Sequence, residues 1–277
     1  MDNNLYKQAH IRALCAEYGF TPQKSFGQNY LITEKPIEKI IAAGELEPDD
    51  TVVEIGPGFG ALTLAVAPLV EKVIAFEIEQ ALRPYWAGLA AEYSNVEVVW
   101  GDALEKIFNF QFSISKQYKV VANLPYSITS SVLRTLLELK NKPERIVVMV
   151  QEEVADRICA RAGGMSLLAV SVQYYGRPKF VFKVTKGCFW PSPKIDSAVL
   201  AITDIKIPVG SDPVFFFKMA RAAFAYKRKQ MWKNIANELK IEPGFVKQAI
   251  LAVVGNEKAR AEDLGIVEWL KLEKAFM

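Results

Sequence analysis

Histidine is nearly absent from this chain, and its scarcity argues against two large classes of enzyme. His10 is the only histidine among 277 residues, and it lies in a polar stretch near the amino terminus. A Ser-His-Asp hydrolase or a His-ligated metal enzyme would need that single residue at its centre. We therefore expect no catalytic role for His10 and no bound metal.

Cysteine is scarce as well. Cys15, Cys159 and Cys188 are odd in number and far apart, so their spacing fits neither a zinc site nor a redox pair. Reduced thiols of this kind are typical of a cytoplasmic protein. We expect the three to be free thiols in that compartment.

Long apolar runs are missing too. The unbroken run at 61–70, ALTLAVAPLV, is too short to cross a bilayer, so no transmembrane helix is expected. The amino-terminal segment lacks the basic region and apolar core of a secretory signal. What is present, 51% apolar and 23% charged residues, predicts an ordinary folded protein with one large and one small domain.

From residue 51 onward, short β-branched runs alternate with helical patterns. This alternation predicts an α/β fold with right-handed crossovers, a mainly parallel sheet and ligands at the carboxyl ends of the strands. Runs at 179–184 and 197–205 are expected to join the sheet as a late hairpin. The predicted parallel strands are 51–56, 72–78, 95–103, 118–125 and 145–150.

A stretch rich in Pro, Gly and Ser, KIPVGSDP at 206–213, marks the expected domain boundary. The chain after it has helical spacing to its end. The sequence thus predicts an α/β domain at 1–205 and a small α-helical domain at 206–277.

The first predicted strand runs into a glycine-rich turn, EIGPGFGALT at 54–63. Gly56, Gly58 and Gly60 allow a sharp turn and close approach of the backbone to a ligand. The pattern also matches the looser G-x-G-x-x-A dinucleotide fingerprint, so a nicotinamide or flavin enzyme has to be considered. Glu77, at the end of the second strand, suits a ribose diol and serves NAD and S-adenosylmethionine equally.

Acidic residues at the strand ends distinguish between NAD and S-adenosylmethionine as the cofactor. Glu54, Glu77 and Asp102 are expected around one cleft, where they would repel a pyrophosphate and tolerate a sulfonium cation. Asp102 is further placed to accept from an adenine amino group. The alternative interpretation is that such acids simply cap the following helices.

The stretch NLPYSITSS, at 123–131, lies between a predicted strand and a predicted helix. One interpretation is a plain turn, because Asn and Pro are common in turns and Ser or Thr caps helices. The other is a polar site at a strand end.

A basic, aromatic-rich segment follows the domain boundary. It spans 218–234 and contains no acid, which fits either a solvated helix face or a surface for a phosphate backbone. Its cations are Lys218, Arg221, Lys227, Arg228, Lys229 and Lys233.

Taken together, the motifs resemble those of the ribosomal RNA adenine dimethyltransferases, in particular the bacterial type that modifies two adjacent adenosines near the 3′ end of 16S RNA. They occur in the expected order over nearly the whole chain. The matching stretches are KSFGQNYL (24–31), EIGPGFGALT, FEIE (76–79), GDAL (101–104), NLPYSIT (123–129), QEEVADR (151–157), FWPSPKIDSAV (189–199), AFAYKRK (223–229) and RAEDL (260–264).

The resemblance implies a Rossmann-like S-adenosylmethionine-dependent methyltransferase domain and a helical RNA-docking domain. It implies a monomer that acts on 16S RNA in immature small ribosomal subunits, with RNA contacts from Arg221, Lys227, Arg228, Lys229 and Lys233. The implied cofactor-binding residues are Gln28, Asn29, Leu31, Gly56, Gly58, Glu77, Ile78, Asp102, Ala103 and Asn123.

The chemistry of adenine methylation gives NLPY a function. The adenine amine is a weak nucleophile, and alignment with polar acceptors helps its attack on a sulfonium methyl more than a strong base would. The Asn123 side chain and the Leu124 backbone carbonyl are the expected acceptors, and Pro125 holds the backbone. Tyr126 and Phe189 are expected to stack on a flipped base.

Other functions stay open at this point. A 23S RNA adenine methyltransferase shares related motifs, and a ribosome-assembly factor without catalysis would share the fold. A NAD-dependent dehydrogenase fits less well, because no hydride-transfer residues are evident. The chain departs from the family in 160–176, which is shorter than the usual loop and leaves the loop's contribution to RNA docking open.

Overall fold

In the computed structural model of the protein, the described residues are 3–22, 27–110, 117–226 and 229–277. The chain divides into two compact units. The first combines Met1–Ala155 with Lys179–Ile205, and the second combines Asp156–Pro178 with Lys206–Met277. Among the described residues, no helix is long and apolar enough to cross a membrane.

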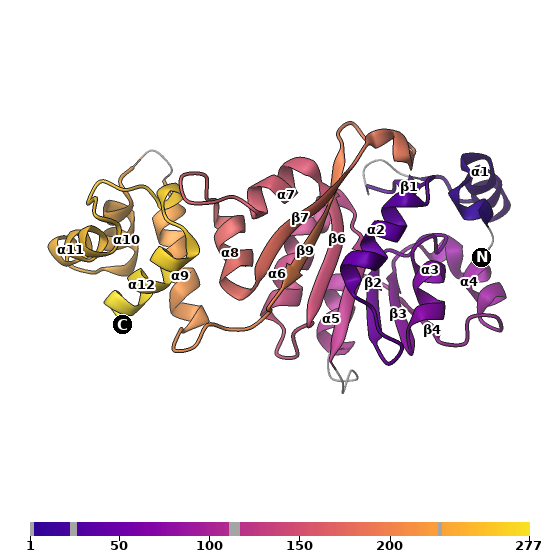
Figure 1. Ribbon diagram of the computed structural model, residues 1–277, viewed down its shortest axis with the longest axis horizontal. Coiled ribbons are helices and arrows are strands. Elements are labelled where there is room, and N and C mark those ends of the chain that lie inside the picture. The colour runs from indigo at the N-terminus through magenta and orange to yellow at the C-terminus, as the bar shows by residue number, and fades with distance from the viewer. Residues whose placement is uncertain (1–2, 23–26, 111–116, 227–228) are drawn as a thin grey trace. The chain divides into compact units, whose positions relative to one another are not determined.

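The first unit is built on a seven-stranded sheet with the order β4-β3-β2-β5-β6-β9-β7 (Figure 1). Neighbours from β4 to β6 pair in parallel, and β9 pairs antiparallel with β6. The predicted α/β fold with a mainly parallel sheet is therefore confirmed. The strands are β2 (Thr51–Ile55), β3 (Lys72–Glu77), β4 (Val96–Trp100), β5 (Tyr118–Asn123), β6 (Arg145–Gln151), β7 (Arg177–Val184) and β9 (Ser197–Thr203).

The central strands are buried along almost their whole length, as expected when helices cover both faces of a parallel sheet. Val52, Val53, Val120 and Val147 are fully buried, so side chains on both faces are in the core. The helices of this unit are α1 (Gln8–Glu17), α2 (Lys35–Gly44), α3 (Thr63–Val66), α4 (Arg83–Leu89), α5 (Ala103–Phe110) and α6 (Thr129–Glu138), and α7 (Glu152–Ile158) begins in it.

Helical spacing explains the packing of α6. Its buried side chains recur every three or four residues, which gathers them on one stripe of the helix. Arg134 and Glu138, on the opposite stripe, are exposed and form an ion pair of 2.9 Å. This is the helix that the sequence predicted after NLPY.

A small antiparallel pair joins two segments that are distant in the sequence. Tyr30 of β1 (Tyr30–Leu31) lies opposite Trp190 of β8 (Phe189–Trp190), and Leu31 lies opposite Phe189. The pair brings the QNYL stretch beside FWPSP. Both stretches therefore lie in the same part of the first unit.

The second unit is helical and has an aromatic core. The Tyr174 ring of α8 (Leu167–Tyr175) lies 4.2 Å from that of Phe216 on α9 (Pro213–Phe224), measured between centroids. Trp269 of α12 (Ile266–Phe276) is fully buried and stacks on Phe224 at 5.7 Å. The other helices are α10 (Met231–Leu239) and α11 (Pro243–Val254).

The second unit begins its main segment at Lys206, where the sequence placed a boundary, but it also includes 156–178. The sequence assigned that stretch to the first domain. The aromatic contacts of α8 explain the difference, because Tyr175 stacks with Phe217 of α9 at 5.6 Å. An aromatic pair between distant segments leaves no periodic signal in either one.

Candidate active site

A pocket of about 200 Å³ lies where β2, β3 and β5 end, within the first unit. All ten positions expected to bind cofactor line it, although they come from five separate stretches of the sequence. These residues are Gln28, Asn29, Leu31, Gly56, Gly58, Glu77, Ile78, Asp102, Ala103 and Asn123.

The glycine-rich turn brings backbone, not side chains, to the pocket. Gly56, Gly58 and Gly60 all have positive φ, with values of 73°, 56° and 80°. A Cβ at Gly58 would lie 2.7 Å from a ring carbon of Tyr30, so any larger residue would displace that ring. The turn is thus shaped by left-handed backbone and by close contact with the QNYL stretch.

Glu77 is a buried acid of the pocket, with 5% exposure. Its Oε2 accepts from the Gly58 amide at 3.0 Å, and its Oε1 accepts from the Glu79 amide at 2.7 Å. Burial raises its pKa, and these amide hydrogen bonds partly offset the rise. The Ile78 amide also interacts with this carboxylate, which keeps acceptor capacity for a ligand hydroxyl.

Asp102 caps a helix and also lines the pocket. Its Oδ1 accepts from the Leu104 amide at 2.8 Å, which is a helix-capping contact at the start of α5. The same exposed residue lines the pocket. A capping role and a place at the pocket are compatible here.

Glu54 is the most deeply buried acid at the pocket, with 2% exposure. The Thr63 hydroxyl donates to its Oε2 at 2.6 Å. Burial raises the pKa of Glu54 to about 8, and the nearby Glu77 charge contributes in the same direction. Glu54 therefore holds a proton near neutral pH before any cation enters the pocket.

Asn123 ends β5 and faces the QNYL stretch. Its Nδ2 donates to the Asn29 carbonyl at 3.1 Å, and the Asn29 Nδ2 in turn donates to the Gly27 carbonyl at 3.0 Å. With Nδ2 used in this way, the remaining polar atom of the Asn123 amide is the acceptor Oδ1. Asn123 and Asn29 are 94 residues apart in the sequence, and this hydrogen bond joins their two segments.

The other expected catalytic residues differ in their placement. Pro125 lines the pocket, whereas Leu124 does not and is only 1% exposed as a whole residue. Tyr126 is half-buried, and its hydroxyl lies 2.6 Å from the Ser197 Oγ. Phe189 is 2% exposed and packs in the core with Leu31, so the structure does not place it on the pocket wall.

Several lining residues were not among those expected. Tyr30 lies inside the QNYL motif and could have been included on that ground, and Ser127 and Ile128 directly follow NLPY. Ile11 comes from α1, far away in the sequence. No local pattern distinguishes Ile11 from an ordinary core residue, which explains why the sequence did not indicate it.

The lining suits a cation better than an anion. It includes four acids and, among the residues described, neither Lys nor Arg; the acids are Glu54, Glu77, Glu79 and Asp102. Because Glu54 is protonated near neutral pH, the negative charge comes from the other three carboxylates, which would repel a pyrophosphate and attract a sulfonium or an ammonium. The described part of the chain also holds no group of three or more His, Cys, Asp or Glu that could bind a metal ion.

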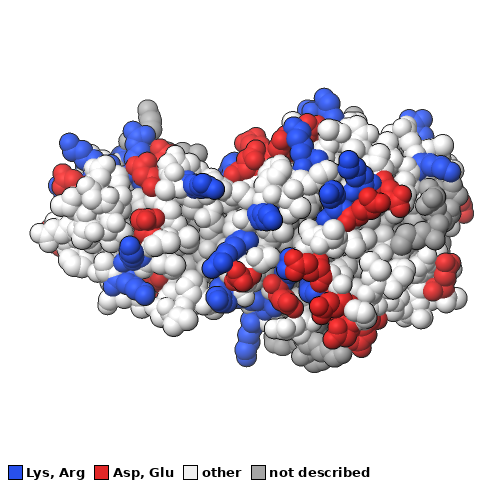
Figure 2. Space-filling view, in the orientation of Figure 1, with Lys and Arg blue, Asp and Glu red and all other residues white. Residues whose placement is uncertain are grey.

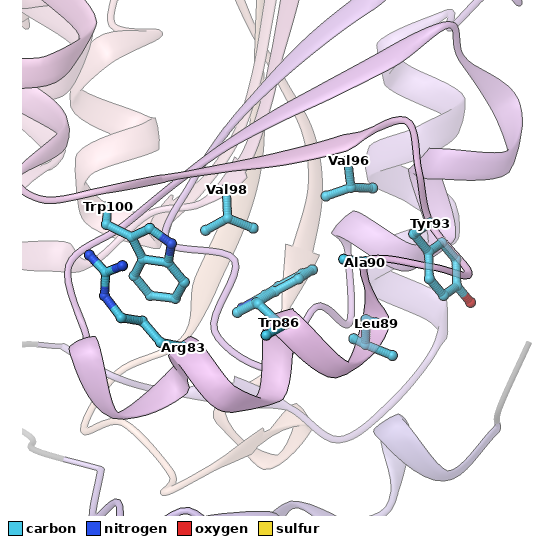
Figure 3. A pocket seen from close by; sticks show the side chains of 9 residues that line it. Arg83, Trp86, Leu89, Ala90, Tyr93, Val96, Val98 and Trp100 are labelled. Atoms are coloured by element: carbon cyan, nitrogen blue, oxygen red, sulfur yellow. The ribbon is translucent and has the colours of Figure 1, made fainter.

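A second hollow, of about 310 Å³, lies between α4 and β4 (Figure 3). Figure 3 shows the Arg83 side chain beside the Trp100 ring, and the guanidinium carbon is 4.7 Å from the ring centroid. Val96, Val98 and Trp86 complete a mainly apolar wall. The described residues that line this hollow include no carboxylate or amide side chain for a polar ligand.

The described residues of the predicted RNA surface are exposed on the second unit. Arg221 lies on α9, Lys229 precedes α10, and Lys233 lies on α10. Lys227 and Arg228 lie outside the described residues. Figure 2 shows acidic and basic side chains interspersed over the displayed face of the molecule.

Aromatic rings accompany these cations. The Lys229 Nζ is 4.5 Å from the centroid of the Tyr226 ring, and Tyr226 is 55% exposed. Trp232 has the Nζ of Lys233 at 5.3 Å and that of Lys247 at 4.3 Å. Exposed rings and cations side by side are typical of surfaces that bind single-stranded nucleic acid.

Comparisons with known proteins identify the family of the chain. Residues 19–276 match the family described as ribosomal RNA adenine dimethylase. A protein of Dehalococcoides mccartyi (strain CBDB1), ribosomal RNA small subunit methyltransferase A, is 40% identical over 270 residues, covering 95% of this chain and 91% of its own. The protein of the same name from Bacillus cereus (strain B4264) is 39% identical over 275 residues, covering 94% and 93%.

Solved structures agree as well. A dimethyladenosine transferase from Plasmodium falciparum superposes with a TM-score of 0.76 at 25% identity, over 89% of this chain and 96% of its own. The 23S rRNA methyltransferase ErmE superposes with a TM-score of 0.70 at 25% identity, over 89% and 99%. With the family match across nearly the whole chain, we conclude that the protein belongs to the ribosomal RNA adenine dimethylase family and is an S-adenosylmethionine-dependent ribosomal RNA adenine dimethyltransferase.

Proposed function

We propose that the protein dimethylates N6 of two adjacent adenosines near the 3′ end of 16S RNA, within immature small ribosomal subunits in the cytoplasm, and that it acts as a monomer. The carrying observation is the convergence of Asn123 and Asn29 with Glu77 on one acidic pocket at the strand ends. The relatives named small-subunit methyltransferases, at 39% to 40% identity, favour 16S over 23S RNA as the substrate.

Each part of the cofactor has suitable residues in the pocket. Glu77 would accept from the ribose hydroxyls, and Asp102 from the adenine amino group. Gln28, Asn29 and Leu31 would border the methionine end. Gly56 and Gly58 bring backbone close without side-chain bulk, and Ile78 and Ala103 would provide apolar contact for the adenine ring. When bound, S-adenosylmethionine supplies an electrophilic methyl group.

The residues of NLPY would align the target amine. The Asn123 Oδ1 and the Leu124 backbone carbonyl would accept from the adenine N6 hydrogens and orient the amine toward the methyl group. Pro125 has a fixed φ of −56° and no amide hydrogen to compete for these acceptors. The Tyr126 ring would stack on the flipped base.

Dimethylation requires that the same acceptors tolerate a methylamine. Two acceptors that each held one amino hydrogen tightly would favour stopping after a single transfer. Asn123 is neutral and already uses its Nδ2 on Asn29, so it would offer one acceptor atom without a full negative charge. This looser arrangement supports a second transfer to the same nitrogen.

RNA docking belongs, in this proposal, to the basic segment 218–234. Arg221, Lys229 and Lys233 are exposed, and the two lysines adjoin aromatic rings, which suits a phosphate backbone with unstacked bases. Lys227 and Arg228 are included on sequence grounds. The functional division into a catalytic part at 1–205 and a docking part at 206–277 is likewise proposed.

The proposed function is tested by a methyl-transfer assay. The substrate is small subunits from a strain that lacks the modification, and the labelled bases are then mapped. We expect two neighbouring N6-dimethyladenosines near the 3′ end of 16S RNA. Label in 23S RNA, offered in a parallel reaction, would instead favour the other substrate. A protein that binds subunits but fails to bind S-adenosylmethionine in a calorimetric titration would be an assembly factor without catalysis.

A further inference from the structure

A hydrogen bond joins Tyr126 of NLPY to Ser197, which does not line the cofactor pocket. Their hydroxyl oxygens are 2.6 Å apart, although 71 residues separate them in the sequence. Tyr126 begins the short helical turn Tyr126–Ile128 directly after Pro125, and Ser197 is the first residue of β9. The contact therefore links the transfer site to the segment that follows FWPSP.

Ser197 is held rigidly. It is fully buried and lies opposite Gln151 in the pairing of β9 with β6. The preceding residue, Asp196, accepts from the Glu152 amide with its carbonyl at 3.1 Å and from the Lys186 amide with its Oδ1 at 2.9 Å. The backbone on both sides of Ser197 is thus anchored, and the hydroxyl has little freedom to move.

Tyr126 is fixed at its backbone in a different way. The Pro125 carbonyl accepts from the Ile128 amide at 3.2 Å, which closes the turn. A Cβ added at Gly27 would lie 3.1 Å from the Tyr126 amide nitrogen, so the chain leading to Asn29 passes directly against the backbone of Tyr126. These contacts place the Tyr126 Cα but leave the two side-chain torsions of the ring undetermined.

The hydroxyl contact determines those torsions. A ring that is tied at its far end to a rigid group cannot swing about χ1, and a locked rotamer preorganises a site. Burial raises the pKa of Tyr126, and the contact with Ser197 partly offsets the rise. The hydroxyl therefore keeps its proton at neutral pH and remains able to form this hydrogen bond.

We infer that Ser197 is a positioning residue for methyl transfer: its hydroxyl holds the Tyr126 ring in the orientation that stacks on the target adenine. The inference rests on the proposed function, in which Tyr126 contacts the base. It adds that the ring needs a fixed orientation, supplied by a residue that touches neither cofactor nor adenine. A base held by a loosely oriented ring would spend less time aligned with the methyl group.

Removing the hydrogen bond from either side provides the test. Ser197→Ala and Tyr126→Phe each delete one hydroxyl and keep the rest of the side chain. Single-turnover methyl transfer at saturating cofactor should slow roughly three- to tenfold in each, the equivalent of one neutral hydrogen bond. The affinities for S-adenosylmethionine and for the small subunit should stay at wild-type values. The double variant should be no slower than the slower single variant.

A matched control removes a hydroxyl elsewhere. Ser171 on α8 donates to the Leu167 carbonyl at 2.7 Å, and Ser171→Ala should leave the rate unchanged. If Ser197→Ala fails to fold, Tyr126→Phe still tests the inference. It removes the same hydrogen bond by a change at a residue that is only half-buried.

The outcomes separate this inference from the proposed function. If Tyr126→Ala is slow while Tyr126→Phe and Ser197→Ala transfer methyl groups at the wild-type rate, the ring acts without Ser197 and the inference is wrong. Additive losses in the double variant would also overturn it, since the two hydroxyls would then act separately. If Tyr126→Ala itself has the wild-type rate, the proposed stacking role fails.

Discussion

Glu77 both holds the glycine-rich turn in place and presents acceptor atoms to the pocket. It holds the glycine-rich turn through the Gly58 amide and offers its remaining lone pairs to the pocket. We predict that Glu77→Ala weakens S-adenosylmethionine binding by about 2–4 kcal/mol, the loss of two charge-assisted hydrogen bonds. Calorimetric titration measures this directly.

The control for Glu77→Ala removes an acid elsewhere on the same sheet. Glu97 on β4 pairs with Lys72 at the surface and is not part of the pocket lining, so Glu97→Ala should bind the cofactor normally. An unchanged cofactor affinity in Glu77→Ala would remove Glu77 from the site.

Glu54 makes the free energy of unfolding depend on pH. The folded carboxyl keeps its proton up to about pH 8, whereas the unfolded one releases it near its usual value of 4.5. Between these values the folded state binds more protons, so the free energy of unfolding falls as pH rises. We predict that Glu54→Gln abolishes this fall, which should amount to about 2–4 kcal/mol.

Denaturant unfolding at pH 5.5 and pH 8.5 measures the effect of Glu54. The wild type should lose more stability between the two conditions than Glu54→Gln does, and the exposed Glu105→Gln should behave as the wild type. Equal pH dependence in wild type and Glu54→Gln would mean that Glu54 is ionised in the folded protein throughout.

The residues that line the pocket could be predicted because most of them stand at a strand end, beside a glycine turn or within a short motif. Phe189 could not be placed in the same way. It follows no strand in the sequence, and only the pairing of β1 with β8 reveals that its ring turns into the core beside Leu31. The Tyr126–Ser197 contact is equally invisible in the sequence, because a hydrogen bond between distant residues has no periodicity.

At the scale of elements, strands were easier to predict than the small pieces between them. Buried apolar runs such as 118–122 and 145–150 have a strong and local signal. The two-residue strands β1 and β8 have none, because a strand so short is defined by its partner. The same reasoning applies to α8, whose core contacts come from α9.

The basic segment provides a test at this scale. We predict that Lys229→Glu with Lys233→Glu weakens binding to the small subunit and flattens its dependence on salt, because fewer counterions are released when the protein binds RNA. The slope of log affinity against log salt should fall by about 0.7 to 0.9 for every phosphate that the variant no longer neutralises. Filter binding over a salt series measures both quantities.

Two exposed lysines outside the segment, Lys258 and Lys271, allow the same change in charge on the same unit. Their replacement by Glu should cost less affinity and keep the slope close to that of the wild type. If the Lys229 and Lys233 variant matches the wild type in both affinity and slope, the segment is a solvated helix face.

At the scale of the whole molecule, the second unit is built from two separate stretches of chain. We therefore predict that a protein ending at residue 205 is less stable than the full chain, since Tyr174 and Tyr175 would lose Phe216 and Phe217 as partners. Thermal unfolding and binding of an apolar dye measure the loss.

Replacing Tyr174 and Tyr175 by Ser in the shortened protein should reduce dye binding, because the exposed rings are its expected cause. A shortened protein that unfolds at the same temperature as the full chain, without binding dye, would show that 156–178 needs no partner from 206–277.

The central claim is that methyl transfer takes place beside Asn123, where cofactor pocket and NLPY meet. Its most direct test is the single-turnover rate of Asn123→Ala with small subunits at saturating S-adenosylmethionine. We predict a fall of roughly a hundredfold or more, the effect of losing one preorganised polar contact, with subunit affinity nearly unchanged. Asn95→Ala, which removes a half-buried amide outside the pocket, should keep the wild-type rate. A wild-type rate in Asn123→Ala would contradict the account and leave NLPY as a turn before a helix.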